Sequence, residues 1–251
     1  MKFNVFESEE LLGKAAAELA AATIRQAAQV KDVVTIVVAT GSSQFSMLKH
    51  LVEQENMPWE KVQAFHLDEY IGISATHPAS FRKYLNERFV SQIPDLKKMT
   101  LINANSKDIP VEVARLNSLI ANEEIDVCLA GIGENGHLAF NDPPANFDTT
   151  EPYIVVDLDQ GCRQQQCNEG WFESIDTVPS KAISMSINQI MKSKKIILSV
   201  LEERKAIAVK NTVTQKVSPE FPASILQNHP DCEMFLDKPA ASLLNTTVLN
   251  R

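Results

Sequence analysis

The sequence predicts an α/β fold in which a mainly parallel sheet has helices on both sides. Short runs of β-branched and other apolar residues recur along the chain, and stretches of helical pattern lie between most of them. Unbroken apolar runs are typical of strands buried on both faces, and parallel strands need a crossover between them. With 251 residues, 44% hydrophobic content and neither a repeat nor a flexible linker, one domain over residues 1–251 is expected.

The spacing of apolar residues predicts the elements in order. Residues 8–29 begin with Ser8 as an N-cap and carry leucines and alanines at helical spacing, which indicates an amphipathic helix. The run VVTIVVA at 33–39 predicts a buried strand, and a helical pattern follows at 45–52. Further strands are predicted at 62–67, 100–103, 125–130, 153–158, 182–187, 195–201 and 233–236, and further helices at 111–121, at 202–210 and from about 76–81.

Composition excludes several classes of function. A formal net charge of -8 leaves no basic stripe to bind a phosphate backbone, so no nucleic-acid partner is expected. No stretch approaches the roughly 18 apolar residues of a membrane span, and the N-terminus lacks the pattern of a secretory signal. The four cysteines show no CxxC spacing, so no metal site is predicted. We therefore expect a cytoplasmic protein without a membrane partner.

Polar groups follow three of the predicted strands, at the edge where parallel α/β sheets bind ligands. The first group is ATGSSQ at 39–44, where Gly41 permits unusual backbone angles. The hydroxyls of Thr40, Ser42 and Ser43 stand beside N–H groups at a helix start, which favours a phosphate loop. An ordinary turn with a serine N-cap explains these residues equally well. The absence of GxGxxG and GxxxxGK[ST] disfavours a bound nucleotide.

The second group is the adjacent pair Asp68 and Glu69, which follows the predicted strand at 62–67. Neighbouring side chains of a strand point to opposite sides, so one carboxylate can enter a cleft while the scaffold holds the other. Asp68 is the candidate base. Taken alone, the pair is more simply a solvated strand end, and the roles of Glu69 and of nearby His77 stay open.

The third group lies in GIGENGHLAFNDP at 131–143, where three glycines in six positions make a tight strand exit that presents His137. A histidine titrates near physiological pH and can act as an acid or a base. Asn135, Asn141 and Asp142 flank it with groups able to fix its tautomer. A lone loop histidine is usually inert, and the role of Glu134 stays open.

Together, TGSSQ at 40–44, LDEY at 67–70 and GIGENGHLAFNDP at 131–143 resemble the glucosamine-6-phosphate deaminase/isomerase family in order and spacing. The resemblance continues through HPASFRKYL, VPSKAISMSI and KAIA and spans most of the chain. It implies a three-layer Rossmann-like fold without a bound nucleotide. It also implies conversion of glucosamine 6-phosphate and water into fructose 6-phosphate and ammonia, without a cofactor. The expected partner is a small-molecule sugar phosphate; family members occur in several oligomeric states, so a homo-oligomer stays open.

The resemblance also assigns roles to residues. It implies that His137 opens the sugar ring with the help of Asn135 and Asp142, and that Asp68 moves a proton between C2 and C1. The substrate-binding residues that it implies are Thr40, Gly41, Ser42, Ser43, Gly133 and Lys205.

Three positions depart from the family pattern. Asn135 stands where many members have Asp, and Asp142 is one methylene shorter than the usual Glu. Gly170 precedes an aromatic pair where well-studied members carry a phosphate-binding Arg. Either Arg163 or Arg204 replaces that cation, or the preferred substrate differs.

Three alternatives follow for the function. The serious one is a deaminase or isomerase for galactosamine 6-phosphate or a related sugar phosphate. A 6-phosphogluconolactonase is disfavoured because Tyr70 and AFNDP stand where that class usually has an Arg and a SLFP-like sequence. A non-catalytic sugar-phosphate sensor is disfavoured because no DNA-binding module accompanies the domain.

Overall fold

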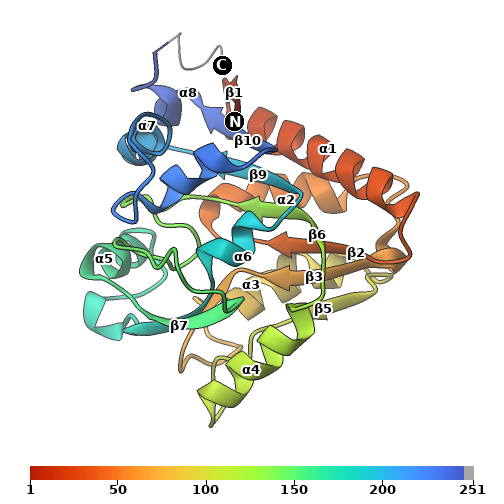
Figure 1. Cartoon of the computed structure of the whole chain (residues 1–251), viewed down its shortest axis with the longest axis horizontal. Coiled ribbons are helices and arrows are strands. Elements are labelled where there is room, and N and C mark those ends of the chain that lie inside the picture. The colour runs from red at the N-terminus through yellow and green to blue at the C-terminus, as the bar shows by residue number, and fades with distance from the viewer. Residues whose placement is uncertain (246–251) are drawn as a thin grey trace.

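The computed structural model describes residues 1–245, which form two sheets (Figure 1). In the larger, seven-stranded sheet every neighbouring pair of strands is parallel. Its spatial order is β1 (Lys2–Phe6), β10 (Cys232–Asp237), β9 (Lys195–Val200), β6 (Ile125–Ala130), β2 (Val34–Val38), β3 (Val62–His66) and β5 (Lys98–Thr100). This confirms the predicted α/β fold with a mainly parallel sheet. The predicted domain over 1–251 includes residues 246–251, which lie outside the described residues.

The smaller sheet is antiparallel and was not predicted. It has the order β4 (Asp68–Tyr70), β8 (Lys181–Met185) and β7 (Tyr153–Asp157). The strands predicted at 153–158 and 182–187 therefore exist, but they pair with each other rather than within the parallel sheet. The second of them ends early because Ser186 accepts a hydrogen bond from Gln189 N–H and starts helix α6 (Ile187–Met191).

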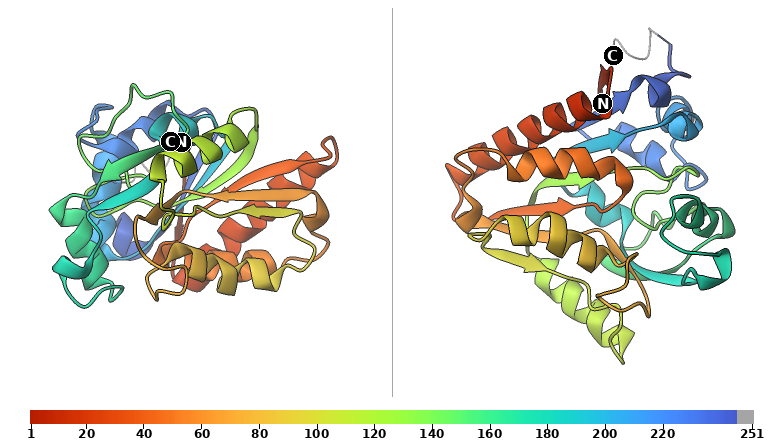
Figure 2. Two further views of the ribbon diagram at one scale, coloured as in Figure 1. Left: turned by 90° about the horizontal axis from the view of Figure 1, so that it is seen from below. Right: turned by 180° about the vertical axis from the view of Figure 1, so that it is seen from behind.

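Helices cover both faces of the parallel sheet (Figure 2). One face packs against α1 (Glu9–Ala28), α2 (Phe45–Val52) and α3 (Phe81–Arg88). The other face packs against α4 (Ile109–Ile120), α6, α7 (Ala206–Thr214) and α8 (Lys238–Ala241). Strand β2 serves both cores by alternation, since Ile36 faces the first core and Val37 the second. Helix α5 (Gln160–Asn168) belongs to a third cluster beside the small sheet.

The strand order reverses between β2 and β6, and this reversal creates the crevice in which sheets of this kind bind ligands. The chain leaves β2 toward β3 on one side, while β6 lies on the other side. The two loops that leave these strands are joined, because Gln44 Nε2 donates a hydrogen bond to the carbonyl of Ala130 (3.1 Å). The first and third polar groups of the sequence therefore meet at one place.

Leu67 joins the two sheets. Its N–H donates to the carbonyl of Val38 in β2 (3.2 Å), and its carbonyl accepts from Met185 N–H in β8 (2.7 Å). The next residue, Asp68, begins β4. The chain thus passes from the parallel to the antiparallel sheet one residue before the second polar group.

Several boundaries differ from prediction. The first helix runs over Glu9–Ala28 with Ser8 as its cap, close to the expected 8–29. The helix predicted at 202–210 is instead a 3-10 turn, Glu203–Lys205, followed by α7. The strand predicted at 100–103 lies earlier, at Lys98–Thr100. Within residues 1–245, no helix has both the length and the apolar character needed to cross a membrane.

Candidate active site

A cavity of about 760 Å³, counted with open solvent at its mouth, lies at the carboxyl ends of β2 and β6. Three strand-exit loops and the turn before α7 surround it. Its lining includes most of the residues singled out in the sequence, namely Thr40, Gly41, Ser42, Ser43, Asp68, Gly133, His137 and Lys205. The lining also contains residues that the sequence did not single out, namely Gln44, Gln165, Gln166, Glu169 and Trp171.

His137 is held by two neighbours that do not line this cavity. Its Nδ1 lies 2.8 Å from Asp142 Oδ1, and the backbone N–H of His137 donates to Asn135 Oδ1 (3.0 Å). Asn135 also donates to Asp142 Oδ1 (2.9 Å), which closes a small ring of contacts. Burial raises the pKa of the Asp142 carboxyl, but the hydrogen bonds from His137 and Asn135 outweigh it and bring the pKa below its usual value. An ionised Asp142 makes Nδ1 the donor, so Nε2 carries the lone pair.

The shorter Asp142 therefore reaches the imidazole directly, although family members usually have Glu at this position. The same carboxylate accepts from the N–H of Asp159 through its second oxygen (3.1 Å), which fixes its plane. Asn135 donates to Asp159 as well (3.1 Å). Both departures from the family pattern thus contribute to the hydrogen bonds that orient His137.

The glycines of the loop allow His137 its place. Gly136 has φ of +84°, a conformation that residues with a side chain rarely adopt. A Cβ at Gly133 would overlap the His137 ring atoms, and Gly133 N–H donates to the His137 carbonyl (3.0 Å). The backbone of Gly133 thus lies directly against the imidazole.

Asp68 is the buried acid of the cavity. Its side chain lines the cavity, the residue is 7% exposed, and no hydrogen bond joins its carboxylate to any of residues 1–245. Burial, with a smaller contribution from the charge of Glu69, raises the pKa of Asp68 well above its usual value. A carboxylate with a raised pKa is a stronger base when it is ionised.

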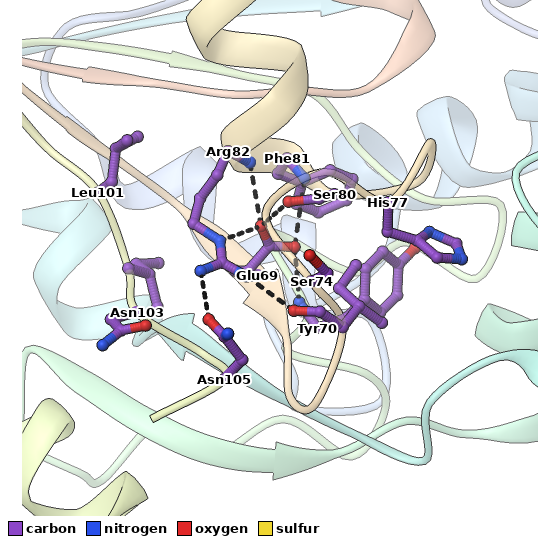
Figure 3. A network of polar contacts seen from close by, with 12 residues as sticks. Glu69, Tyr70, Ser74, His77, Ser80, Phe81, Arg82, Leu101, Asn103 and Asn105 are labelled. Carbon is purple, nitrogen blue, oxygen red and sulfur yellow. Dashed lines mark hydrogen bonds and ion pairs between the residues drawn. The ribbon is translucent and has the colours of Figure 1, made fainter. Parts of the chain in front are cut away.

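Glu69 follows Asp68 in β4, and its side chain points toward Ser80 and Arg82 at the start of α3 (Figure 3). Its carboxylate accepts hydrogen bonds from Ser80 Oγ (2.7 Å), from Phe81 N–H (3.2 Å) and from both the N–H (3.0 Å) and Nε (3.1 Å) of Arg82. It therefore binds the first N–H groups of α3 and forms a buried ion pair with Arg82. Arg82 in turn donates to Asn105 and to the carbonyl of Ile73.

His77 and Glu134 have structural partners. His77 Nδ1 accepts from Ala79 N–H (3.0 Å), and its ring stacks on Phe172 with centroids 5.5 Å apart. It does not line the cavity. Glu134 forms an ion pair with Arg204 (2.7 Å).

Lys205 supplies a free positive charge to the cavity. It is 7% exposed, and no hydrogen bond or ion pair joins its ammonium to any residue within 1–245. Burial lowers the pKa of Lys205 to about 8, because the charged form is poorly solvated. Across the cavity, the turn at Ser42–Gln44 leads into α2, and the first N–H groups of such a start have no partner within the helix. A cation and free N–H groups on one cavity favour an anionic ligand.

The two arginines proposed as replacements for the missing cation differ in position. Arg163 does not line the cavity; its guanidinium donates to the carbonyls of Ile175 (2.6 Å) and Val178 (3.1 Å) and anchors the segment after α5. The prediction that Arg163 binds substrate is thus not supported. Arg204 lines the cavity and pairs with Glu134, Glu169 and Glu202.

His137, Asp142 and Cys162 form a group of three potential metal ligands among the described residues, with ligand atoms within 4.8 Å of one another. Burial is the main cause that raises the pKa of the Cys162 thiol far above its usual value, and the charge of Asp142 adds to it. A neutral thiol is a poor ligand. Asp142 is already bonded to His137, Asn135 and Asp159, so the trio suits hydrogen bonding better than metal binding.

The cavity combines three chemical capacities. It has a buried carboxylate with a raised pKa, an imidazole with a fixed tautomer, and an ammonium that has no ion-pair partner within residues 1–245 and lies opposite a helix start. These groups suit proton transfer at a carbon next to a carbonyl or imine in an anionic substrate.

Comparison with known sequences identifies relatives from a single family. The sequence profile of the family described as Glucosamine-6-phosphate isomerases/6-phosphogluconolactonase matches residues 7–234. A glucosamine-6-phosphate deaminase of Streptococcus sanguinis (strain SK36) is 37% identical over 244 residues, which cover 97% of this chain and 99% of the relative. A glucosamine-6-phosphate deaminase of Listeria monocytogenes serotype 4a is 38% identical over 214 residues, covering 85% and 88%.

Solved structures share the fold. A monomeric glucosamine-6-phosphate deaminase matches with a TM-score of 0.86 and 33% identity, covering 97% of this chain and 100% of that chain. A 6-phosphogluconolactonase from Shewanella baltica OS155 matches with a TM-score of 0.78 and 17% identity, covering 94% and 97%. At 17% identity, the likeness to the lactonase concerns the fold alone.

Proposed function

Because the chain belongs to the family of glucosamine-6-phosphate isomerases and 6-phosphogluconolactonases, we propose that it deaminates and isomerises an amino-sugar phosphate. The proposed reaction converts glucosamine 6-phosphate and water into fructose 6-phosphate and ammonia. One observation carries the proposal: Asp68, His137 and the unpaired Lys205 line the same cavity. Relatives of 35–38% identity that are named as glucosamine-6-phosphate deaminases support the choice of substrate.

Ring opening is assigned to His137. The closed sugar must lose the proton of its C1 hydroxyl while its ring oxygen gains one, which gives the open aldehyde. An imidazole whose Nδ1 bonds to ionised Asp142 can accept and return that proton through Nε2. Asn135 and Asp142 act as positioning residues, because both bond to His137 and neither lines the cavity.

Proton transfer between carbons is assigned to Asp68. Its carboxylate removes the proton from C2 and returns it to C1, while the aldehyde oxygen gains a proton that the ammonium group on C2 releases. The C1 aldehyde thereby becomes an alcohol, and C2 becomes an iminium carbon. Water then adds to C2, and the C–N bond breaks with release of ammonia, which leaves the C2 ketone. The poor solvation of Asp68 strengthens it as a base for this step.

Substitution of Asp142 by Asn is expected to lower kcat by about a hundredfold or more, with little change in KM. The Asn amide has no negative charge to place beside the imidazole, and its NH2 group can donate a hydrogen bond where the carboxylate could only accept. The tautomer with the proton on Nδ1 therefore loses its preference. Kinetics of purified protein with glucosamine 6-phosphate check this. Asp148→Asn, which removes the same charge from an exposed position, is the control. An unchanged kcat in Asp142→Asn would contradict the role of the carboxylate.

The phosphate is assigned to Lys205 and the segment from Thr40 to Ser43. Substrate recognition should then weaken as pH rises. Lys205 is charged below its pKa of about 8 and loses its charge as pH increases through that value. We expect kcat/KM to fall above pH 8, chiefly through KM. In Lys205→Met, KM should rise by about tenfold or more and lose this dependence, since a charged hydrogen bond contributes about 1.5–3 kcal/mol. A KM that stays flat in the wild type would contradict the assignment.

The test of the function is a parallel assay of ammonia and ketose phosphate. Purified protein receives glucosamine 6-phosphate, galactosamine 6-phosphate or 6-phosphogluconolactone in separate wells. Release of ammonia from the first substrate supports the proposal. Acid formation from the lactone without ammonia would replace it by a lactonase, and binding of all three without turnover would replace it by a sensor.

The epimeric substrate, galactosamine 6-phosphate, is the second candidate. It is favoured by the wall of the cavity, where Gln165, Gln166 and Glu169 lie in the segment that lacks the usual Arg. Amide and carboxylate groups there can bond to sugar hydroxyls, and a buried hydroxyl left without its partner lowers kcat/KM strongly. The ratio of kcat/KM for the two epimers therefore decides between them.

The proposal includes a cytoplasmic location and a small sugar phosphate as the partner. Support comes from the lack of a membrane-spanning helix within residues 1–245 and from the names of the relatives. A homo-oligomer stays open; the solved relative of 33% identity is described as monomeric.

A further inference from the structure

Among residues 1–245, Lys205 has no ion-pair partner, although three carboxylates lie around the same end of the cavity. Glu169 and Glu202 line the cavity with Lys205, and Glu134 lies in the loop that carries His137. Glu169 is the strongest opposite charge acting on Lys205, yet no hydrogen bond or ion pair joins them. A partly buried ammonium beside a free carboxylate would ordinarily form an ion pair, because their attraction is weakly screened there.

Arg204 binds all three of these carboxylates. Its Nη1 donates to Glu134 Oε1 (2.7 Å) and to Glu169 Oε1 (2.8 Å). Its Nε donates to Glu202 Oε2 (2.7 Å). The planar guanidinium presents its donors in fixed directions, so one arginine can hold several carboxylates at once.

Glu169 accepts hydrogen bonds from two further side chains. Gln165 Nε2 donates to Glu169 Oε1 (2.8 Å), and Trp171 Nε1 donates to Oε2 (3.2 Å). Gln165 Oε1 in turn accepts from Glu134 N–H (3.0 Å). The carboxylate that acts most strongly on Lys205 is therefore kept in one orientation, toward Arg204.

The charges at this end of the cavity explain why such restraint matters. Three carboxylates face two cations, so this end is negative by one charge before an anion arrives. A carboxylate that moved onto Lys205 would occupy the position that an anionic ligand needs. It would also repel that ligand.

We propose that Arg204 keeps Lys205 available for the substrate's anionic group by holding Glu134, Glu169 and Glu202 away from it. Arg204 is thus a positioning residue that acts through Lys205. The inference rests on the proposed function only in taking Lys205 as the group that binds phosphate. With Lys205 available, the cavity has a cation for an anionic ligand although Gly170 stands where well-studied family members carry an Arg.

The test measures the binding of inorganic phosphate to the full chain at pH 7 by calorimetry. Arg204→Gln should weaken binding about tenfold, because Glu169 then pairs with Lys205, and a charged hydrogen bond of this kind is worth about that factor. Adding Glu169→Gln to that variant should restore binding to within about threefold of the wild type. Lys205→Met should weaken phosphate binding by about tenfold or more in every background.

Two controls separate this effect from a loss of folding. Arg115→Gln breaks another arginine–glutamate pair, with Glu112 in α4, and should leave phosphate binding unchanged. Arg204→Lys keeps the charge but cannot hold three carboxylates, so it serves if the glutamine variant does not fold. The same rescue by Glu169→Gln is expected in that background.

Two results would overturn the inference. If the double variant binds phosphate as weakly as the single Arg204 variant, Arg204 contacts the anion itself or acts only on stability. If Lys205→Met binds phosphate normally, the anion lies elsewhere. Because phosphate binding needs no turnover, rescue without ammonia release would refute the proposed function alone. Ammonia release without rescue would refute this inference alone.

Discussion

Asp68→Asn is expected to remove turnover and to stabilise the folded protein at neutral pH. The amide has nearly the same shape as the carboxylate but cannot take the C2 proton, so kcat should fall by about a thousandfold. Binding of fructose 6-phosphate should persist, because the phosphate is assigned to Lys205 and the segment from Thr40 to Ser43. A loss of kcat together with a gain in stability distinguishes a carboxylate that acts in catalysis from one that stabilises the fold.

The stabilisation follows from the raised pKa of Asp68. Burial makes the folded protein hold this proton more tightly than the unfolded chain, whose aspartate has the usual pKa of about 3.8. As pH rises above that value, the unfolded chain releases the proton first, and the folded state loses relative stability. Asn carries no such penalty. The gain in Tm should be largest at neutral pH and should shrink as pH is lowered toward 4.

Thermal melting of both proteins across pH checks the stability, and ammonia release checks the activity. A variant that keeps near wild-type kcat would show that another group is the base. A variant that is less stable than the wild type at pH 7 would show that the Asp68 carboxylate makes favourable contacts in the folded state.

Gly133→Ala is expected to lower kcat/KM by about a hundredfold or more while the protein still folds. The added methyl would overlap the His137 ring, which cannot turn aside because its Nδ1 is bound to Asp142. Displacement of a catalytic group by about 1 Å is enough for a loss of this size. Overpacking costs about 1–3 kcal/mol of stability, which a domain of this size tolerates.

Gly161→Ala is the matched control for this variant. It adds the same methyl in α5, where the new Cβ meets only Asp159 Oδ1 at 3.2 Å. Its kcat/KM should stay close to that of the wild type. If Gly133→Ala were equally active, the imidazole would have room to move, and its tight placement would not be required for turnover.

The sequence predicted those elements whose burial leaves a local pattern. Strands β2, β6 and β9 are buried at every position, and each reads as a mainly apolar run. Strand β1 is a partly exposed edge of five residues, so it lacks that signal. The antiparallel sheet was not predicted because pairing between β4, β8 and β7 depends on residues far apart in the chain.

In the candidate site, too, the features that leave a local sequence pattern were predictable, and those that depend on distant residues were not. Alternation along a strand indicated that Asp68 and Glu69 diverge, and the structure has Asp68 at the cavity and Glu69 beneath α3. The environment of Arg204 was not predictable, because it depends on where α5 ends relative to the turn before α7. Helix α5 itself, QGCRQQQCN, has no apolar period; it begins where Asp159 accepts from Cys162 N–H (2.5 Å).

The position of Arg163 outside the cavity was not predictable for a related reason. Its charge and its nearness to the missing Arg made it a candidate, but its side chain turns toward the carbonyls of Ile175 and Val178. Sequence distance does not give the direction of a side chain.

At Leu67 the chain passes between two sheets, and residues near one sheet can be substituted independently of residues near the other. The segment from Thr40 to Ser43 and the loop that carries His137 follow strands of the parallel sheet, whereas the polar wall of Gln165, Gln166 and Glu169 lies near the small sheet. Asp68 lies where the two sheets meet, directly after Leu67, which has a hydrogen bond to each sheet. Substitutions confined to residues 160–172 are therefore expected to change which sugar is accepted, while Asp68 and His137 keep their positions.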